Sequence, residues 1–295
     1  SPLSRRAGHH GRAARRSVYV TGRCPSRETT DMPFVDLDHV KLFYSDDGDG
    51  ETSMLLVHGL GADSHDWIFN IPALAASHRV IAVDLRGHGH STVPTSGYAV
   101  DDYVTDLVRL LDHLDIDRTI AVGHSLGGTI VAHLAVEHPD RILGVVEVDP
   151  AYGYDPAWPA AFQQTADAID EQGSGAAVPG LAAFWTAETP PALRCWHARQ
   201  VQAVPPRVLA SSMRHWGLQH PATVLTADAQ EWLTRRAAPV LAIYADPART
   251  AWEEKTFTSP SSRAVAYPGA GHWLHQERPE TFNELLITWL DSIHY

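Results

Sequence analysis

The sequence predicts an α/β protein, in which a mostly parallel sheet is flanked by helices and carries an inserted helical cap. Short runs of β-branched and other apolar residues alternate with amphipathic stretches from Phe34 onward, which is the pattern of parallel strands joined by helices. This regular spacing stops at Asp149 and resumes at Val240, about ninety residues later. With 295 residues, 44% of them apolar, the chain can bury one large core.

The strands are expected in order along the chain, each four or five residues long. They are expected at Lys41–Tyr44, Met54–Val57, Val80–Val83, Thr119–Val122, Gly144–Val148, Val240–Tyr244 and Ala264–Tyr267. Runs this short and this apolar suit strands that are buried on both faces of a sheet. Because parallel neighbours need a crossover between them, we expect helices in the intervening segments.

The segment 150–237 is predicted to form the cap, or lid, and residues 32–149 and 238–295 to form the α/β core. Five of the nine tryptophans fall within the cap segment, among prolines, alanines and stretches of helical periodicity. They are Trp158, Trp185, Trp196, Trp216 and Trp232. Such side chains can line a pocket for a hydrophobic ligand, and they are also what seals a cap onto a core.

Residues 1–31 differ in composition from the rest of the chain. They contain seven arginines against Glu28 and Asp31, and the whole chain has a formal net charge of −12, which leaves about −17 on the other 264 residues. The segment has no apolar periodicity and few large side chains, so its burial cannot offset the entropy of ordering it. We expect a disordered basic extension.

Charge and cysteine usage exclude several classes of protein. A net charge of −12 argues against a nucleic-acid partner, because phosphates repel an acidic surface. No run reaches the roughly 18 apolar residues of a membrane span, and no secretion signal is evident, so no membrane partner is expected.

Cys24 and Cys195 belong to no spaced Cys/His set. A cytoplasmic location is therefore expected, and the oligomeric state stays open.

The strongest chemical signal is the hexapeptide 123–128, which reads Gly-His-Ser-Leu-Gly-Gly and follows a strand-like run. It places Ser125 at a sharp strand-to-helix turn, where small neighbours such as Gly123 and Gly127 can surround a strained residue. Such a turn lifts a hydroxyl clear of the sheet. Ser125 is the predicted nucleophile.

The tetrapeptide His58-Gly59-Leu60-Gly61 directly follows the strand predicted at Met54–Val57. Glycines at this point let backbone amides face a cavity, and two preorganised N–H groups stabilise the oxyanion formed in acyl transfer. The expected oxyanion hole consists of the backbone amides of Leu60 and Leu126, the second being the residue after the nucleophile.

A general base is expected at His272, within Gly269-Ala270-Gly271-His272-Trp273. An imidazole on a loop at the end of a strand can reach a serine on another strand. The other histidine-rich motif, Arg86-Gly87-His88-Gly89-His90-Ser91, has no carboxylate or cysteine at ligand spacing, and we interpret it as a tight loop after Asp84. No metal and no cofactor are expected.

Taken in order, these motifs resemble those of the α/β-hydrolase superfamily, from Phe34 to Tyr295. The residues on which the resemblance rests are His58-Gly59, the run from Asp84 to Ser91, Gly123 to Gly128, and Gly271-His272. The resemblance implies the α/β-hydrolase fold and a branch that has a serine nucleophile and a helical cap. It also implies acyl transfer, in which His272 takes the proton of Ser125 and water later releases the acid.

The acid of the triad departs from the commonest pattern of the superfamily. Most members carry it shortly after the next-to-last strand, where this chain reads Tyr244-Ala245-Asp246-Pro247. The other known placement is the end of the strand after the nucleophile, where Asp149 lies 24 residues beyond Ser125. We predict Asp149, with Asp246 as the alternative. Asp149 could instead cap the following helix. Its placement is similar to that in zearalenone-type lactonases.

The predicted function is that of a serine esterase or lactonase acting on a hydrophobic small molecule through an acyl-enzyme. Two alternatives within catalysis are a carbon–carbon bond hydrolase and a perhydrolase of the same fold, because one fold hosts many chemistries. An alternative of another class is a receptor-like α/β-hydrolase, which binds its ligand with little turnover.

Overall fold

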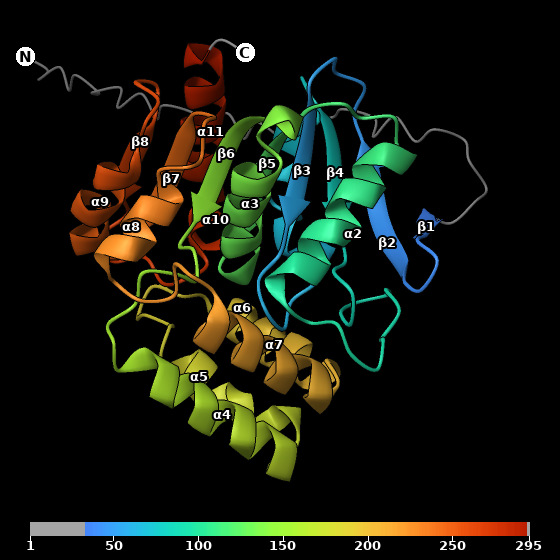
Figure 1. Ribbon diagram of the computed structural model, residues 1–295, viewed down its shortest axis with the longest axis vertical. Helices are drawn as coiled ribbons and strands as arrows, with labels where there is room; N and C mark the ends of the chain where they lie inside the picture. The colour runs from blue at the N-terminus through green and yellow to red at the C-terminus, as the bar shows by residue number, and fades with distance from the viewer. Residues whose placement is uncertain (1–32, 294–295) are drawn as a thin grey trace, which may run out of the picture.

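The structure, a computed structural model, describes residues 33–293 and contains one eight-stranded sheet (Figure 1). The strands are β1 (Phe34–Asp36), β2 (Lys41–Asp47), β3 (Ser53–Val57), β4 (Arg79–Val83), β5 (Thr119–His124), β6 (Ile142–Val148), β7 (Val240–Tyr244) and β8 (Arg263–Ala266). Their order across the sheet is β1-β2-β4-β3-β5-β6-β7-β8. Strands β3 to β8 run parallel, whereas β1 and β2 pair antiparallel. The predicted α/β fold with a mostly parallel sheet is confirmed.

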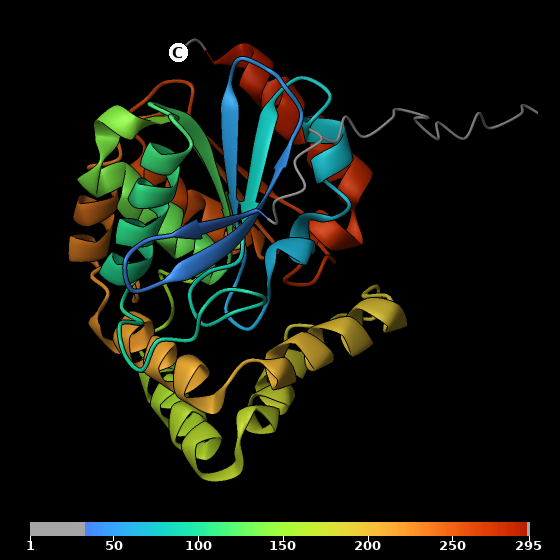
Figure 2. The same cartoon turned by 90° about the vertical axis from the view of Figure 1, so that its right-hand side faces the viewer.

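Helices cover both faces of the sheet, as Figure 2 shows. One face packs against α2 (Val100–His113) and α3 (Leu126–Glu137), and the other against α1 (Ile71–Leu74), α10 (Leu274–Glu277) and α11 (Pro279–Ser292). Successive residues of a strand serve opposite faces. In β3, for example, Leu55 and Val57 pack with the first group of helices and Met54 and Leu56 with the second. Strands buried on both faces explain the continuous apolar runs in the sequence.

Four helices lie together at one end of the sheet, and we call them the cap helices (Figures 1 and 2). They are α4 (Trp158–Gln172), α5 (Val178–Ala182), α6 (Pro191–Ala203) and α7 (Pro206–Gln219). Helices α4 and α7 approach closely at Gly217, where an added Cβ would lie 2.7 Å from the ring of Phe162. A 2.7 Å hydrogen bond between Tyr103 of α2 and Ser212 of α7 connects the cap helices to a helix that covers the sheet.

The structure differs from the sequence prediction in several elements. Strand β1 was not predicted, because three residues of an edge strand carry too little pattern. Strand β8 ends at Ala266, one residue before the predicted end. Helix α8 (Ala227–Leu233) falls within the predicted cap segment but packs on the core, with Ala229 and Leu233 against Ala132 and Tyr152.

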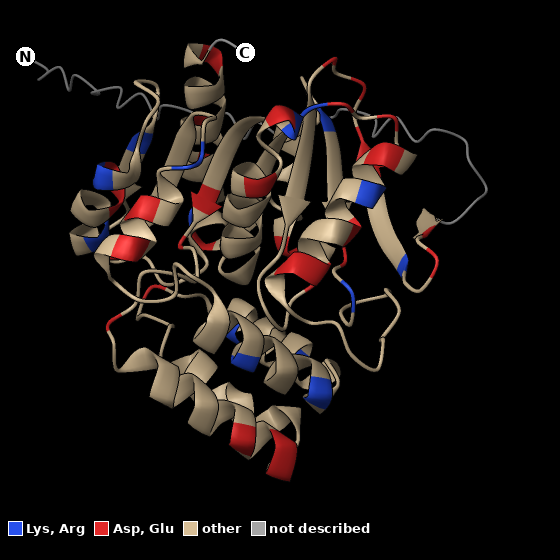
Figure 3. Ribbon diagram, in the orientation of Figure 1, with Lys and Arg blue, Asp and Glu red and all other residues tan. Residues whose placement is uncertain are grey.

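One further α-helix, α9 (Pro247–Glu253), follows β7. The short 3-10 segments are η1 (Ser64–Trp67), η2 (Pro139–Arg141), η3 (Ser174–Ala177) and η4 (Glu254–Thr256). Charged residues lie mainly on the helices and loops around the sheet, and the strands carry few of them (Figure 3). In the part of the chain that the structure describes, no helix has the length and apolar character to cross a bilayer. The extension predicted at 1–31 lies outside the described residues.

Candidate active site

Ser125 lies in the one-residue turn between β5 and α3. Its backbone has φ +52° and ψ −118°, a region that non-glycine residues rarely adopt. The turn requires glycine two residues before and two residues after Ser125. A Cβ at Gly123 would lie 2.1 Å from the carbonyl oxygen of Gly127, and one at Gly127 would lie 2.2 Å from that of Val57. The sequence therefore dictates this geometry locally.

His272 lies on the loop after β8, and its Nδ1 is 2.5 Å from Oδ2 of Asp149. Asp149 directly follows β6 and also has a positive φ, +42°. Burial raises the pKa of the Asp149 carboxyl, but the hydrogen bond to His272, the charge of that imidazole and the backbone N–H of Ala245 together outweigh burial, and the pKa is lowered. Asp149 is therefore ionised at neutral pH, and the imidazole donates its Nδ1 proton to it.

The other candidate acid, Asp246, lies elsewhere. It is exposed and its carboxylate accepts a 2.9 Å hydrogen bond from the backbone N–H of Ala248, as the N-cap of α9. Its neighbour Ala245 donates a backbone N–H to Oδ1 of Asp149 at 3.3 Å. The loop after β7 thus contributes a backbone donor that holds Asp149, and Asp149 is the carboxylate that contacts the imidazole.

The predicted oxyanion loop packs directly on the nucleophile turn. A Cβ at Gly59 would lie 3.1 Å from Cβ of Ser125. His58 orients the loop, since its Nδ1 lies 2.7 Å from the carbonyl oxygen of Gly59 and its Nε2 accepts a 3.0 Å hydrogen bond from the N–H of Leu85. Leu126 is the first residue of α3, where helical N–H groups have no partner within the helix. Its amide therefore has no partner within α3.

The histidine-rich loop after β4 supports this arrangement. Asp84 accepts hydrogen bonds from the backbone N–H groups of Ser64 (2.7 Å) and His90 (2.8 Å). The N–H of Gly61 donates to Nε2 of His88 at 3.2 Å. Burial lowers the pKa of His88 to about 3, so this imidazole is neutral and can accept. The motif braces the loop 59–64, as the prediction of a tight loop after Asp84 implies.

Three contacts that the sequence did not reveal hold the loop of His272. The backbone N–H of His272 donates to the carbonyl oxygen of Phe184 at 3.3 Å. The carboxylate of Glu277 accepts from the N–H of Gly271 and from the hydroxyl of Thr189, each at 2.6 Å. Phe184 and Thr189 belong to the connection between α5 and α6. Glu277 lies only five residues beyond the histidine, but its role depends on a partner that is distant in sequence.

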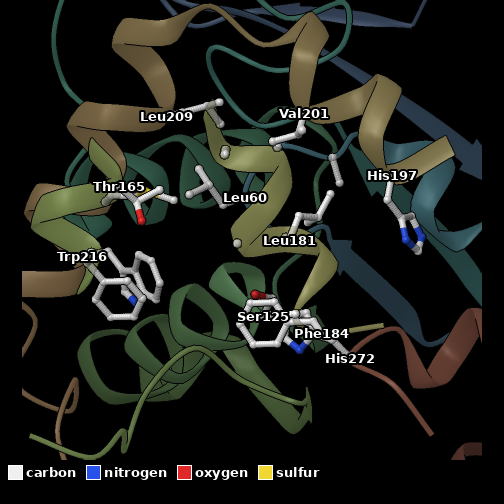
Figure 4. A pocket seen from close by; sticks show the side chains of 18 of the residues that line it. Leu60, Ser125, Thr165, Leu181, Phe184, His197, Val201, Leu209, Trp216 and His272 are labelled. Atoms are coloured by element: carbon white, nitrogen blue, oxygen red, sulfur yellow. The ribbon is translucent and has the colours of Figure 1, made fainter. Parts of the chain in front are cut away.

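A cavity of about 260 Å³ lies between Ser125, His272 and the cap helices. Figure 4 shows Ser125, His272 and Phe184 at one end of it and Leu209 and Val201 at the other, with Trp216 at one side. Among the described residues, its wall contains no lysine, arginine, aspartate or glutamate. Its aromatic residues are Tyr154, Trp158, Phe162, Phe184, Trp216 and Trp273. The cavity therefore offers a mostly apolar surface, without acidic, lysine or arginine side chains among its described lining residues, next to the hydroxyl of Ser125.

Comparisons with known proteins agree with the observed fold. A family model described as the alpha/beta hydrolase fold matches residues 52–279. The structure resembles the enol-lactonase from Burkholderia xenovorans LB400, with a TM-score of 0.76 and 24% identity, over 88% of this chain and 100% of that chain. It also resembles an enzyme that degrades N-acyl homoserine lactones, with a TM-score of 0.72 and 25% identity, over 87% of this chain and 99% of that chain.

A match to a larger relative covers only part of that protein. The dihydrolipoyllysine-residue acetyltransferase component of an acetoin cleaving system from Cupriavidus necator is 38% identical over 117 residues. This match includes 40% of the present chain and 31% of the relative. The chain therefore spans about a third of that protein, and the likeness concerns one part of it.

Proposed function

Because the chain belongs to the alpha/beta hydrolase fold family, we propose that it is a serine hydrolase that cleaves a carboxylic ester or lactone of a neutral, hydrophobic small molecule. The observation that carries this proposal is the hydrogen bond of 2.5 Å between His272 and Asp149, beside a strained Ser125 that lines the same cavity as His272. Nucleophile, base and orienting carboxylate are the parts that acyl transfer requires.

The proposed reaction has two steps. Since Nδ1 of His272 donates to Asp149, the other ring nitrogen, Nε2, is free to take the proton of Ser125 as its oxygen attacks the carbonyl carbon. The backbone amides of Leu60 and Leu126 then stabilise the oxyanion, and His272 returns the proton to the leaving alcohol. Water, deprotonated by the same imidazole, attacks the acyl-serine and releases the acid.

The cavity wall supports a neutral substrate. A carboxylate or ammonium group that leaves water for an uncharged cavity loses its hydration without gaining a partner, and this costs several kcal/mol or more. The cavity offers no charged side chain among its described lining residues. Esters and lactones with apolar acyl groups avoid that cost, and the resemblance to a lactone-degrading enzyme supports including lactones.

A substrate panel tests the proposal. The purified chain and its Ser125→Ala variant are incubated with p-nitrophenyl esters of increasing acyl length, with neutral lactones, and with matched substrates that carry a carboxylate. Products are identified by mass spectrometry. We expect the wild type alone to hydrolyse the neutral esters or lactones, and a fluorophosphonate probe to label Ser125.

Other outcomes point to the alternatives. Cleavage of a diketone without ester turnover would indicate a carbon–carbon bond hydrolase, and peracid formation from hydrogen peroxide would indicate a perhydrolase. Tight binding of a neutral ligand with negligible turnover would indicate a receptor. Equal hydrolysis by wild type and Ser125→Ala would exclude the serine mechanism.

A further inference from the structure

Three buried side chains from distant parts of the sequence meet directly behind the nucleophile turn. Asp66 belongs to η1, His124 ends β5 and His275 belongs to α10. The exposed fraction of each side chain is 1% or less. Oδ2 of Asp66 lies 3.4 Å from Nδ1 of His124 and 3.7 Å from Nε2 of His275. The proposed acyl-transfer mechanism uses none of these atoms.

The converging atoms have no hydrogen-bond partner among the residues that the structure describes. They are Oδ2 of Asp66, Nδ1 of His124, and both ring nitrogens of His275. Buried polar atoms in folded proteins nearly always have a partner, and a group of orphaned atoms points to an ion or ligand at that place. Four such atoms in one cluster therefore require an explanation.

The surrounding hydrogen bonds direct two of these atoms toward one another as acceptors. Nε2 of His124 lies 3.0 Å from the carbonyl oxygen of His272, which can only accept, so the ring proton is on Nε2 and Nδ1 carries a lone pair. Gln276 donates to Oδ1 of Asp66 at 2.6 Å and leaves Oδ2 free. A lone pair and a carboxylate oxygen 3.4 Å apart repel each other unless a cation lies between them.

The hydrogen bonds of His124 and Asp66 follow a pattern that is typical of metal ligands. A metal-bound histidine usually donates its other ring N–H to a backbone carbonyl or carboxylate, and a metal-bound carboxylate usually accepts a further hydrogen bond. All three ligand atoms lie within 4.8 Å of one another. A point equidistant from atoms with these separations is at most about 2.4 Å from each, close to the 2.0–2.2 Å of zinc–nitrogen and zinc–oxygen bonds and shorter than the hydrogen bonds of a water molecule.

We propose that Asp66, His124 and His275 bind one divalent transition-metal ion, with zinc as the preferred ion. Two imidazoles and one carboxylate are ligands that such ions favour. The ion would link η1, the nucleophile turn and α10. Among its ligands only His124 borders the cavity, and Asp66 and His275 are fully buried away from it, so the role of the ion would be structural, and the inference does not rest on the proposed esterase or lactonase activity.

The test begins with metal analysis of the full chain. The protein is produced without a polyhistidine tag in medium that contains zinc, purified without chelators, and measured by inductively coupled plasma mass spectrometry. We expect about one equivalent of a divalent transition metal per chain. Because the site is buried, the metal is removed by unfolding in guanidinium with a chelator, followed by refolding with zinc, with cobalt or with neither.

Refolding with zinc is expected to raise the melting temperature by about 5 °C or more over the metal-free protein. Refolding with cobalt is expected to produce the visible absorption bands of a low-coordinate Co²⁺ site. Asp66→Asn and His275→Gln should lose the bound metal and the zinc-dependent part of the melting temperature. His78→Gln is the matched control, because His78 is also a buried histidine but bonds to Ser77 and Leu74; it should retain the metal.

Metal-free wild-type protein whose melting temperature does not respond to zinc would overturn the proposal. In that case a proton shared by Asp66 and His124 would occupy the same place, and nitrogen NMR of the histidines would show a doubly protonated ring. Retention of one metal equivalent by both cluster variants would also overturn it. These readouts are independent of catalysis, so a hydrolase that contains no metal and an inactive protein that contains one are distinguishable.

Discussion

Replacing Asp149 by asparagine tests the acid of the proposed triad at the point where two candidates compete. Asparagine has the shape of aspartate and tolerates a positive φ better than most residues, so the +42° backbone of this position can persist. Asp246→Asn is the matched control. Asparagine and aspartate are about equally good N-caps. The control should therefore leave α9, and the capping hydrogen bond from the N–H of Ala248 to residue 246, nearly unchanged.

The magnitude follows from the two hydrogen bonds of Asp149. Its oxygens accept from Nδ1 of His272 at 2.5 Å and from the N–H of Ala245 at 3.3 Å. An amide has only one oxygen, so one of these bonds must be lost. If the amide N–H₂ faces His272, the imidazole must turn to the tautomer that cannot accept the proton of Ser125. In either orientation the charge that stabilises the imidazolium is lost. We expect kcat to fall by roughly 10⁴, equivalent to about 5.5 kcal/mol.

The assay measures kcat on the best neutral ester or lactone, with a melting curve for each variant. Loss of a hydrogen bond to a charged group costs about 1.5–3 kcal/mol of folding free energy, so Asp149→Asn should melt a few degrees below the wild type and remain folded at the assay temperature. Asp246→Asn should keep normal kcat. A fast Asp149→Asn enzyme, or a slow Asp246→Asn enzyme with a normal melting curve, would refute the assignment.

Three further predictions follow. Ser125→Ala should lower kcat by about 10⁴ to 10⁶ with an unchanged circular dichroism spectrum, and a variant that keeps a tenth of wild-type turnover would contradict the serine mechanism. Burial lowers the pKa of His220 from 6.5 to about 3, so between these pH values the unfolded chain binds more protons than the folded chain. The free energy of unfolding should therefore fall as the pH drops from 6.5 toward 3. Urea titrations at several pH values should show a weaker fall for His220→Gln. Arg236 is fully buried between Glu147 and Glu253, so Arg236→Met should cost about 3–5 kcal/mol in denaturant unfolding, whereas Arg214→Met, which breaks partly exposed pairs, should cost about 1 kcal/mol or less.

The seven predicted strands are all present, and the central ones, β3 to β7, are short apolar runs that are almost wholly buried. Their positions fixed where the motifs fall: Ser125 after β5, the loop of Gly59 after β3 and His272 after β8. In a parallel sheet the carboxyl ends of the strands share one edge, so residues that follow different strands meet there. Local signals of strand and turn were therefore sufficient to place these side chains around one cavity.

Contacts between distant segments could not be predicted in the same way. The cluster of Asp66, His124 and His275 has no ligand spacing in the sequence, since its members come from three separate elements. The histidine-rich motif that the sequence analysis considered for metal binding, at His88 and His90, instead holds a loop in place. The burial of Arg236 was also invisible, because a single arginine is usually a surface residue and its partners, Glu147 and Glu253, are distant in the sequence.

The ambiguity over the acid has a structural origin. Strands β6 and β7 are neighbours, with Val148 paired to Ile243. The backbones of residues that follow these two strands are therefore close together at the same end of the sheet. The N–H of Asp149 donates to the carbonyl oxygen of Ile243 at 2.7 Å and its carboxylate contacts His272, while Asp246 lies further along its loop and caps a helix. A carboxylate can therefore be supplied from either strand without moving the histidine. The path of the backbone after each strand distinguishes the two positions, and the residue types at these positions do not reveal that path.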